Sequence, residues 1–392
     1  MSTDGIALSC DDLGAFFGTA HASLAERLRA GALEGLRGDH DPTEIAPSLG
    51  HPLGLYAYLV PEALGGAAVG RPESATYVDV RSLVLIREAL GQVSPLADAI
   101  FAVQGLGTYP LVLAGTAAQR ARWIPDAISG KAIGAFALTE PEAGSDAASL
   151  LTTARKEGAS WILDGEKTLI SNVPLARFHV VFANADPAQG RKGISAFVVE
   201  QGTPGLEATP IPMSIPHPIG RLRLEGCRVP AEALIGEVGM GFRLAMETLD
   251  AFRISVGAAA TGMARRALSC TLAHVASRRQ FGAPLADQQI VRAYLAQMAT
   301  ELDASRLLVA RAAHKRDTEG GRVSTEAAMA KMYATEAAQR IIDHAVQLHG
   351  GIGVVEGTEV ERLYREIRPL RIYEGATEIQ QLIIAKGLFE KR

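Results

Sequence analysis

The segment RIYEGATEIQ, residues 371–380, contains a carboxylate with the chemistry of a general base, Glu374. Such a base removes a proton from a bound substrate when its surroundings raise its affinity for protons. The Tyr-Glu-Gly triplet before a Thr and a Glu is also ordinary chemistry for the start of a helix, which would make Glu374 a solvated acid beside a turn. The segment by itself leaves both interpretations open.

Other kinds of catalytic site find little support in the sequence. The nine histidines are scattered, and no His pair or carboxylate–His pair falls on an evident single face, so no metal site is predicted. The sequence contains neither a G-x-S-x-G elbow nor a Walker A loop. The commonest hydrolase and kinase classes therefore lose support.

Five segments follow one another along the chain: AFALTEPEAGSD (135–146), LDGEKTLIS (163–171), SRRQFGAPLADQQ (277–289), QLHGGIG (347–353) and YEGATEIQ (373–380). In this order they resemble the acyl-CoA dehydrogenase family of flavoenzymes. Each segment alone is weak evidence, because glycine turns and helix ends of this composition are common. The segments VPEALGG (60–66) and GTAAQRARWIPDAISGKAIGAF (115–136) fit the same family, so the resemblance extends over nearly the whole chain.

The resemblance implies FAD as the cofactor and assigns flavin contacts to the first two segments. Backbone groups of Leu138 and the hydroxyl of Thr139 are expected at the pyrimidine side of the flavin, together with Phe136. Leu169 stands where the family usually has an aromatic residue, most often Trp, so a stacking surface is lost. Ser171 keeps the hydroxyl that hydrogen-bonds flavin N5 in the family; a strand-end Ser that bonds its own backbone is the alternative.

The other segments are expected to contact the rest of FAD. In the family, residues matching Arg278 and Gln280, followed here by Phe281, reach the pyrophosphate and adenosine of a neighbouring subunit's FAD. An Arg that compensates a helix dipole is the alternative. Backbone N–H groups at helix ends bind phosphate well, and the resemblance assigns further FAD contacts to such positions. Plain helix caps are the alternative interpretation. These residues are Gln347, Gly350, Gly351, Ala376, Thr377 and Glu378.

For Glu374 the resemblance implies the role of catalytic base. The family removes the α-proton of an acyl thioester while hydride leaves the β-carbon for flavin N5, and that proton is too weakly acidic for an exposed carboxylate with a pKa of about 4.3. We therefore expect Glu374 in a dry pocket, with Tyr373 and Gly375 beside it at the substrate. In some branches the base lies on the helix containing LDAFR, but the matching residue here is Phe252, which cannot accept a proton.

Three further residues are expected at the substrate. Ser145 is placed to meet the phosphorylated tail of the thioester, and a β-turn rich in Glu, Pro and Gly is the alternative interpretation of its loop. Asp250 and Arg253 fall where the family lines the acyl and pantetheine end of the pocket. For these two residues an i, i+3 surface ion pair is the alternative.

The elements that must position these residues follow from the spacing of apolar residues. Residues 1–132 and 237–392 have helical spacing, whereas residues 133–236 contain short β-rich runs ended by Gly, Pro, Asn or Asp. The sequence thus predicts an α+β, mainly α fold in three domains with these bounds. The resemblance specifies a small β-barrel or sandwich in the middle, a C-terminal four-helix bundle, and a homotetramer with the bundles at its centre.

Composition disfavours nucleic-acid-binding, membrane and secreted proteins. Hydrophobic residues make up 48% of the 392 residues, as in globular proteins, and a net charge of −4 without a basic run disfavours nucleic acid. No stretch reaches the roughly 18 uninterrupted apolar residues of a membrane span. The N-terminus lacks the features of a signal peptide, and the three cysteines form no C-x-x-C pair. We therefore expect a cytoplasmic protein without a membrane partner.

The preferred hypothesis is an FAD-dependent acyl-CoA dehydrogenase that passes electrons to an electron-transfer flavoprotein. One alternative is an acyl-ACP dehydrogenase of a biosynthetic pathway. A flavin monooxygenase or oxidase on the same fold is disfavoured, because those enzymes tend to lack a Glu at the position of Glu374. A binding protein that has lost turnover is a further alternative, since Leu169 and Ala376 depart from the family pattern.

Overall fold

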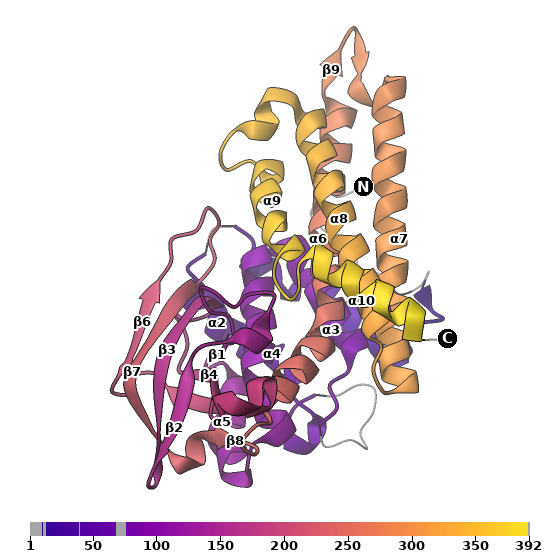
Figure 1. The fold of residues 1–392 in the computed structure, drawn as a ribbon. Helices are drawn as coiled ribbons and strands as arrows, with labels where there is room; N and C mark the ends of the chain where they lie inside the picture. The colour runs from indigo at the N-terminus through magenta and orange to yellow at the C-terminus, as the bar shows by residue number, and fades with distance from the viewer. Residues whose placement is uncertain (1–9, 11–12, 39, 68–75, 391–392) are drawn as a thin grey trace. The chain divides into compact units, whose positions relative to one another are not determined.

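The order of elements is helices, then strands, then helices (Figure 1), as the sequence predicts. The computed structural model describes residue 10 and residues 13–38, 40–67 and 76–390. The first helices are α1 (Thr19–Arg27), α2 (Pro42–Gly50), α3 (Val80–Val93), α4 (Pro95–Ala114) and α5 (Ala117–Ser129). The strands that follow are β1 (Gly134–Ala137), β2 (Thr153–Glu157), β3 (Ser160–Ser171), β4 (Phe178–Asn184), β5 (Ile194–Glu200), β6 (Leu206–Pro210), β7 (Ile219–Pro230) and β8 (Leu234–Ile235).

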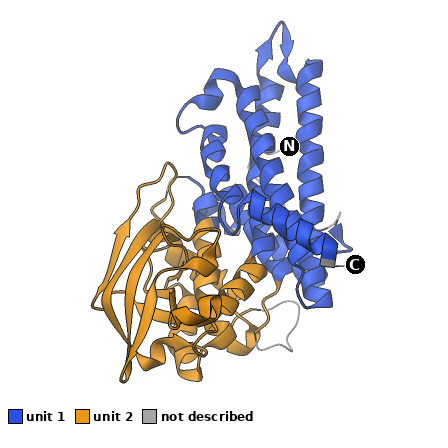
Figure 2. Ribbon diagram, viewed as in Figure 1, with its two compact units in different colours: residues 1–38, 80–98, 253–392 blue, residues 39–79, 99–252 orange. Residues whose placement is uncertain are grey.

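The second helical part contains long helices joined by short connections. Its elements are α6 (Gly241–Ser277), β9 (Arg279–Gln280), β10 (Ala283–Pro284), α7 (Gln289–Glu319), α8 (Ser324–His349), α9 (Glu359–Ile367) and α10 (Thr377–Glu390). The chain divides into two compact units (Figure 2). Unit 1 comprises residues 1–38, 80–98 and 253–392, and unit 2 comprises residues 39–79 and 99–252. The three domains expected from the sequence stay a prediction.

Unit 2 contains a sheet with the strand order β6-β7-β3-β2-β4-β5-β8, in which β1 pairs in parallel with β4. β4 and β5 are almost entirely buried, since apolar residues predominate in both and do not alternate with polar ones. β3 runs antiparallel to β7, and its register shifts between Lys167 and Ile170. Leu169 lies inside this irregularity with a φ of 54° and 55% of its surface exposed. The bulge therefore turns an apolar side chain outward.

Unit 1 is mainly helical, and one of its hydrophobic clusters lies between α7, α8, α9 and the part of α6 that follows residue 252. Glycine permits a close crossing of α3 and α6. A Cβ on Gly91 would lie 2.4 Å from the carbonyl oxygen of Ala259, and one on Gly262 would lie 2.1 Å from that of Glu88. Any larger side chain at either position would separate the two helices.

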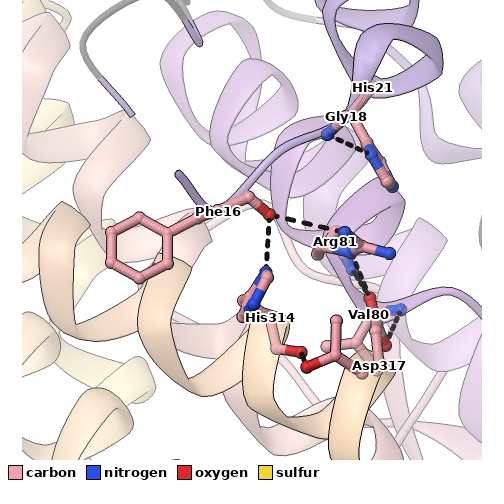
Figure 3. A network of polar contacts seen from close by, with 8 residues as sticks. Phe16, Gly18, His21, Val80, Arg81, His314 and Asp317 are labelled. Carbon is pink, nitrogen blue, oxygen red and sulfur yellow. Dashed lines mark hydrogen bonds and ion pairs between the residues drawn. The ribbon is translucent and has the colours of Figure 1, made fainter. Parts of the chain in front are cut away.

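The N-terminus of α3 is held by Asp317 of α7. The Asp317 carboxylate accepts hydrogen bonds from the backbone N–H groups of Val80 (3.1 Å) and Arg81 (2.9 Å), and from Nε of Arg81 (3.0 Å). In Figure 3 Arg81 and His314 both reach the carbonyl oxygen of Phe16, at 3.5 and 3.1 Å. A carboxylate at a helix N-terminus satisfies donors that have no partner within the helix. Asp317 thereby joins α3 and α7.

Among the helices of the described residues, α4 is the one that is long and apolar enough to cross a membrane by length and composition. Its most apolar window is 83% buried. The core helix of a globular protein has both properties, so this feature is weak evidence for a membrane span.

We predict that Asp317→Asn lowers the free energy of unfolding by about 1–2 kcal/mol, because the variant loses the charge that accepts from two backbone donors and from Arg81. Urea denaturation at neutral pH measures the change. The matched control is Asp343→Asn on the exposed face of α8, which we expect to stay within about 0.5 kcal/mol of the parent protein. Equal effects of the two substitutions would contradict the role given to Asp317.

Candidate active site

Glu374 lies in a turn of unit 1, directly before α10, in an uncommon backbone conformation. Its φ is 52°, and the φ of Gly375 is 90°. Gly375 suits this position because it has no side chain, and a Cβ there would lie 2.5 Å from Nε2 of Gln380. A non-glycine residue in the left-handed region is strained, and such strain often occurs at functional sites.

Side chains from three helices hold the carbonyl groups of this turn. Nε of Arg253 on α6 donates to the Glu374 carbonyl at 3.3 Å. Nζ of Lys331 on α8 donates to the Gly375 carbonyl at 2.8 Å. Nε2 of Gln380 on α10 donates to both carbonyls, at 3.3 and 2.8 Å. The strained turn is therefore held by two donors that are distant in the sequence, Arg253 and Lys331, and by one from the helix that follows it.

The carboxylate of Glu374 is buried although the residue as a whole is partly exposed. Its Oε2 atom has no hydrogen-bond partner among the described residues. Burial raises the pKa of Glu374, while the positive charges of Arg87, Arg253 and Lys331 oppose that rise. Glu374 is thus a carboxylate with an increased affinity for a proton and one oxygen left without a partner.

A buried network beside this turn centres on Arg87 of α3. Its guanidinium donates to both carboxylate oxygens of Asp98, each at 2.8 Å, and Nη1 donates to Oγ of Ser255 at 3.0 Å. Arg87 and Asp98 are fully buried. Burial also raises the pKa of the neighbouring Tyr373 hydroxyl, and the charge of Arg87 opposes this. The network keeps one cation close to Glu374 without exposing it to water.

In unit 2, the loop after β1 is fixed against β3 by a buried ion pair. Nζ of Lys167 lies 2.6 Å from the Glu140 carboxylate and donates to the Leu138 carbonyl at 3.2 Å. The backbone N–H of Thr168 donates to the Thr139 carbonyl at 3.0 Å. Burial lowers the pKa of Lys167 to about 8, and Glu140 opposes this shift. The structure thus brings the Leu138–Thr139 backbone onto the strand that carries Leu169 and Ser171.

Ser171 makes a contact that sequence reasoning missed. Its Oγ lies 2.7 Å from Nε2 of His217 in the loop before β7. Burial lowers the pKa of His217 to about 4, so this imidazole is neutral at pH 7. The available signal was a lone His in the Pro-rich stretch PMSIPHPIG, residues 212–220. Ser171 is therefore paired to an imidazole rather than bonded to its own strand.

The remaining predicted residues lie on several elements. Phe136 packs against Phe182 with ring centroids 4.9 Å apart, and Ser145 is exposed in the loop after β1. Asp250 lies on the part of α6 that belongs to unit 2, as does the buried Phe252, which packs edge-on against Tyr109. The Thr377 hydroxyl donates to Glu336 at 2.6 Å. The other residues assigned to FAD are partly or fully exposed on unit 1: Arg278, Gln280, Phe281, Gln347, Gly350, Gly351, Ala376 and Glu378.

Arg87, Asp98, Ser255, Lys331 and Gln380 were also missed by sequence reasoning. Arg87 did carry a signal, because it interrupts the apolar run SLVLIREAL of α3, residues 82–90. Lys331 is a cation in the Ala-rich stretch of α8 and is fully buried. A charged residue inside an apolar segment is a candidate for a buried polar network. The sequence did not indicate which partner each one meets.

Comparison with known proteins identifies the family. Three family models match in order: acyl-CoA dehydrogenase, N-terminal domain, over residues 11–131; middle domain, over 135–227; and C-terminal domain, over 239–389. The chain is 41% identical over 340 residues to the short-chain specific acyl-CoA dehydrogenase, mitochondrial, of Homo sapiens, with 86% of this chain and 80% of that protein covered. The chain belongs to the acyl-CoA dehydrogenase family.

Solved structures agree with this assignment. Butyryl-CoA dehydrogenase from Megasphaera elsdenii superposes with a TM-score of 0.87 at 31% identity, over 95% of this chain and 99% of that one. A glutaryl-CoA dehydrogenase from Mycobacterium smegmatis in complex with FADH2 gives a TM-score of 0.84 at 27% identity, over 97% of each chain. The protein is an oxidoreductase of this family, and FAD is its cofactor.

The described residues fit this cofactor. Leu169 offers an exposed apolar surface next to the Ser171 hydroxyl, which suits a flat ring system with polar edges. On unit 1, the exposed side chains of Arg278 and Gln280 provide donors of the kind that bind phosphate oxygens. These residues are the ones that we expect to hold FAD.

We predict that Glu374→Gln makes the protein more stable, relative to the parent, as the pH rises. A folded-state pKa raised above the unfolded value means that the folded parent binds more protons in that interval, so its stability falls as pH rises through it. Gln mimics the protonated acid and lacks this loss. The difference should grow by about 1.4 kcal/mol for each unit of pKa shift.

Denaturation of both proteins at a series of pH values from about pH 4 upward measures this difference. Glu26→Gln, on the exposed face of α1, is the control and should follow the parent protein at every pH. A pH-independent difference between the parent and Glu374→Gln would mean that the Glu374 carboxylate is solvated.

Proposed function

We propose that the protein catalyses the α,β-dehydrogenation of short-chain acyl-CoA thioesters, with Glu374 as the base that removes the α-proton. The observation that carries this proposal is the buried Oε2 of Glu374, which has no partner among the described residues and belongs to a carboxyl whose pKa is raised by burial. A solvated acid would have neither property. The interpretation of Glu374 as a base is therefore favoured over that of a surface residue.

The proton transfer follows from the chemistry of a thioester. The Cα–H bond breaks, the proton passes to the carboxylate of Glu374, and negative charge develops on the thioester oxygen. The backbone N–H of Glu374 donates to no acceptor in the described part of the chain, so it is available for that oxygen. FAD supplies the acceptor for the hydride that leaves the β-carbon.

The turn conformation supports this role. A φ of 52° at Glu374 and 90° at Gly375 directs both carbonyl groups toward Arg253, Lys331 and Gln380. With both carbonyls occupied, the backbone from which the Glu374 side chain projects is held in place. Fixed orientation of a base lowers the entropic part of the barrier to proton transfer.

The substrate class rests on relatives. The human relative is named a short-chain specific acyl-CoA dehydrogenase, and a structural neighbour is a butyryl-CoA dehydrogenase. We extend this specificity to the present chain. We also propose a cytoplasmic location, an electron-transfer flavoprotein as the electron acceptor and a homotetrameric assembly, as expected from the sequence. An acyl group carried on an acyl carrier protein is the second candidate substrate.

An anaerobic titration of the FAD-loaded protein with straight-chain, branched, cyclic and dicarboxylic acyl-CoAs tests the proposal. We expect butyryl-CoA or a close analogue to bleach the visible flavin absorbance. Glu374→Gln should bind the same thioester but reduce the flavin about 10²- to 10⁴-fold more slowly, because it lacks the base. The control Glu26→Gln should react like the parent.

Three outcomes separate the alternatives. Bleaching by an acyl-ACP, with no response to any acyl-CoA, would replace the CoA substrate by the carrier-protein one. Reduction of the Glu374→Gln flavin at the parent rate would show that another group is the base. Absence of bleaching by every thioester would exclude the dehydrogenase function.

A further inference from the structure

Lys331 is a buried cation that makes fewer hydrogen bonds than its chemistry requires. Its side chain is fully buried on α8, and Nζ donates to the Gly375 carbonyl at 2.8 Å. This is its one hydrogen bond among the described residues, although an ammonium group has three donors. A buried ammonium in this state is costly unless a negative charge lies close to it.

Four charged groups act on Lys331, and one of them is a carboxylate with a buried oxygen that has no hydrogen-bond partner among the described residues. Glu374 is the foremost charge that favours the ammonium, followed by Glu336 and Glu378, while Arg253 opposes it. Glu336 is already engaged, because it accepts from Nε of Arg371 at 2.8 Å and from the Thr377 hydroxyl. Glu378 is exposed. The carboxylate of Glu374, whose Oε2 has no partner, is therefore the natural counter-charge of Lys331.

The Gly375 carbonyl alone does not explain the charge. Nε2 of Gln380 donates to the same oxygen at the same 2.8 Å, so a neutral donor already serves this group. A neutral side chain of similar length on α8 would pack there without the cost of a buried charge. The ammonium thus needs a role that a neutral residue cannot fill.

We propose that Lys331 is a positioning residue that both holds the Glu374–Gly375 turn and keeps the Glu374 carboxylate ionised between turnovers. The inference rests on the proposed function of Glu374 as the base. A nearby positive charge favours the ionised form of a carboxylate and so offsets part of the rise in the pKa of Glu374 that burial causes. Without Lys331, a larger fraction of the enzyme would hold a protonated base at neutral pH.

The first test measures how the rate of flavin reduction in the FAD-loaded protein depends on pH. The rate is measured by stopped flow with butyryl-CoA, or with whichever acyl-CoA of the anaerobic titration reacts fastest. Lys331→Met removes the donor and the charge, Lys331→Gln keeps a neutral donor, and Lys331→Arg keeps the charge. At low pH the rate of flavin reduction falls because Glu374 becomes protonated. We expect the midpoint of this fall to move up by about one pH unit in the Met and Gln variants. In the Arg variant the midpoint should stay at the parent value.

A second test does not depend on activity. Burial lowers the pKa of Lys331 to about 8, whereas an unfolded Lys has a pKa of about 10.4. The unfolded chain therefore binds more protons between these values, and this residue makes the parent more stable as the pH rises through them. The stability of the parent relative to Lys331→Met should increase over this interval. Lys131→Met, an exposed control, should show no such trend.

The outcomes distinguish this inference from the function on which it rests. If the rate of Lys331→Gln falls at the same low pH as that of the parent while Glu374→Gln still does not reduce the flavin, the role of Lys331 is overturned. The role of Glu374 as the base is then retained. A loss of rate in Lys331→Gln that is equal at all pH values overturns the electrostatic part of the proposal. Fast reduction by Glu374→Gln overturns the proposed function itself. If Lys331→Met does not fold, the Gln and Arg variants carry the test.

Discussion

The burial of one carboxylate among three cations is the constraint on which unit 1 depends. Water would lower the pKa of Glu374, and dry surroundings without positive charge would leave it protonated. The charges of Arg87, Arg253 and Lys331 partly offset the rise in the pKa of Glu374 that burial causes, so the carboxyl lies between these two extremes. These cations come from α3, α6 and α8, so the helices must keep their relative positions. Glycines at the crossing of α3 and α6, and Asp317 at the start of α3, contribute to that arrangement.

Arg87 and Lys331 are held in different ways, and the differences indicate different tasks. Arg87 makes three hydrogen bonds, two to Asp98 and one to Ser255, which make it a fixed charge. Lys331 has a single hydrogen bond, to the turn that carries Glu374. An Arg in a bidentate pair keeps its proton under all ordinary conditions, whereas a buried Lys has a pKa that responds to its neighbours. Glu374 is therefore surrounded by permanent and adjustable charges.

Unit 2 also contains a buried cation close to a carboxylate, and there the pair fixes a loop to a strand. The buried pair of Lys167 and Glu140 fixes the loop after β1 to β3, so that backbone groups of Leu138 and Thr139 lie against the strand that ends at Ser171. Leu169 projects from an irregularity in β3 and exposes an apolar surface. The contact of Ser171 with the neutral imidazole of His217 gives this hydroxyl a fixed partner.

The amino-acid sequence by itself determined the order of helices and strands, the family, the cofactor and the candidate base, because periodicity and short motifs are properties of neighbouring residues. It also marked Phe252 as unable to serve as a base. Only the tertiary structure decided which side chains surround Glu374. Arg87, Arg253 and Lys331 lie on helices far from Glu374 in the sequence, and helical spacing identifies a buried face without naming the residue opposite it. The pKa of Glu374 and the strain of its turn follow from those long-range contacts, and no local pattern contains them.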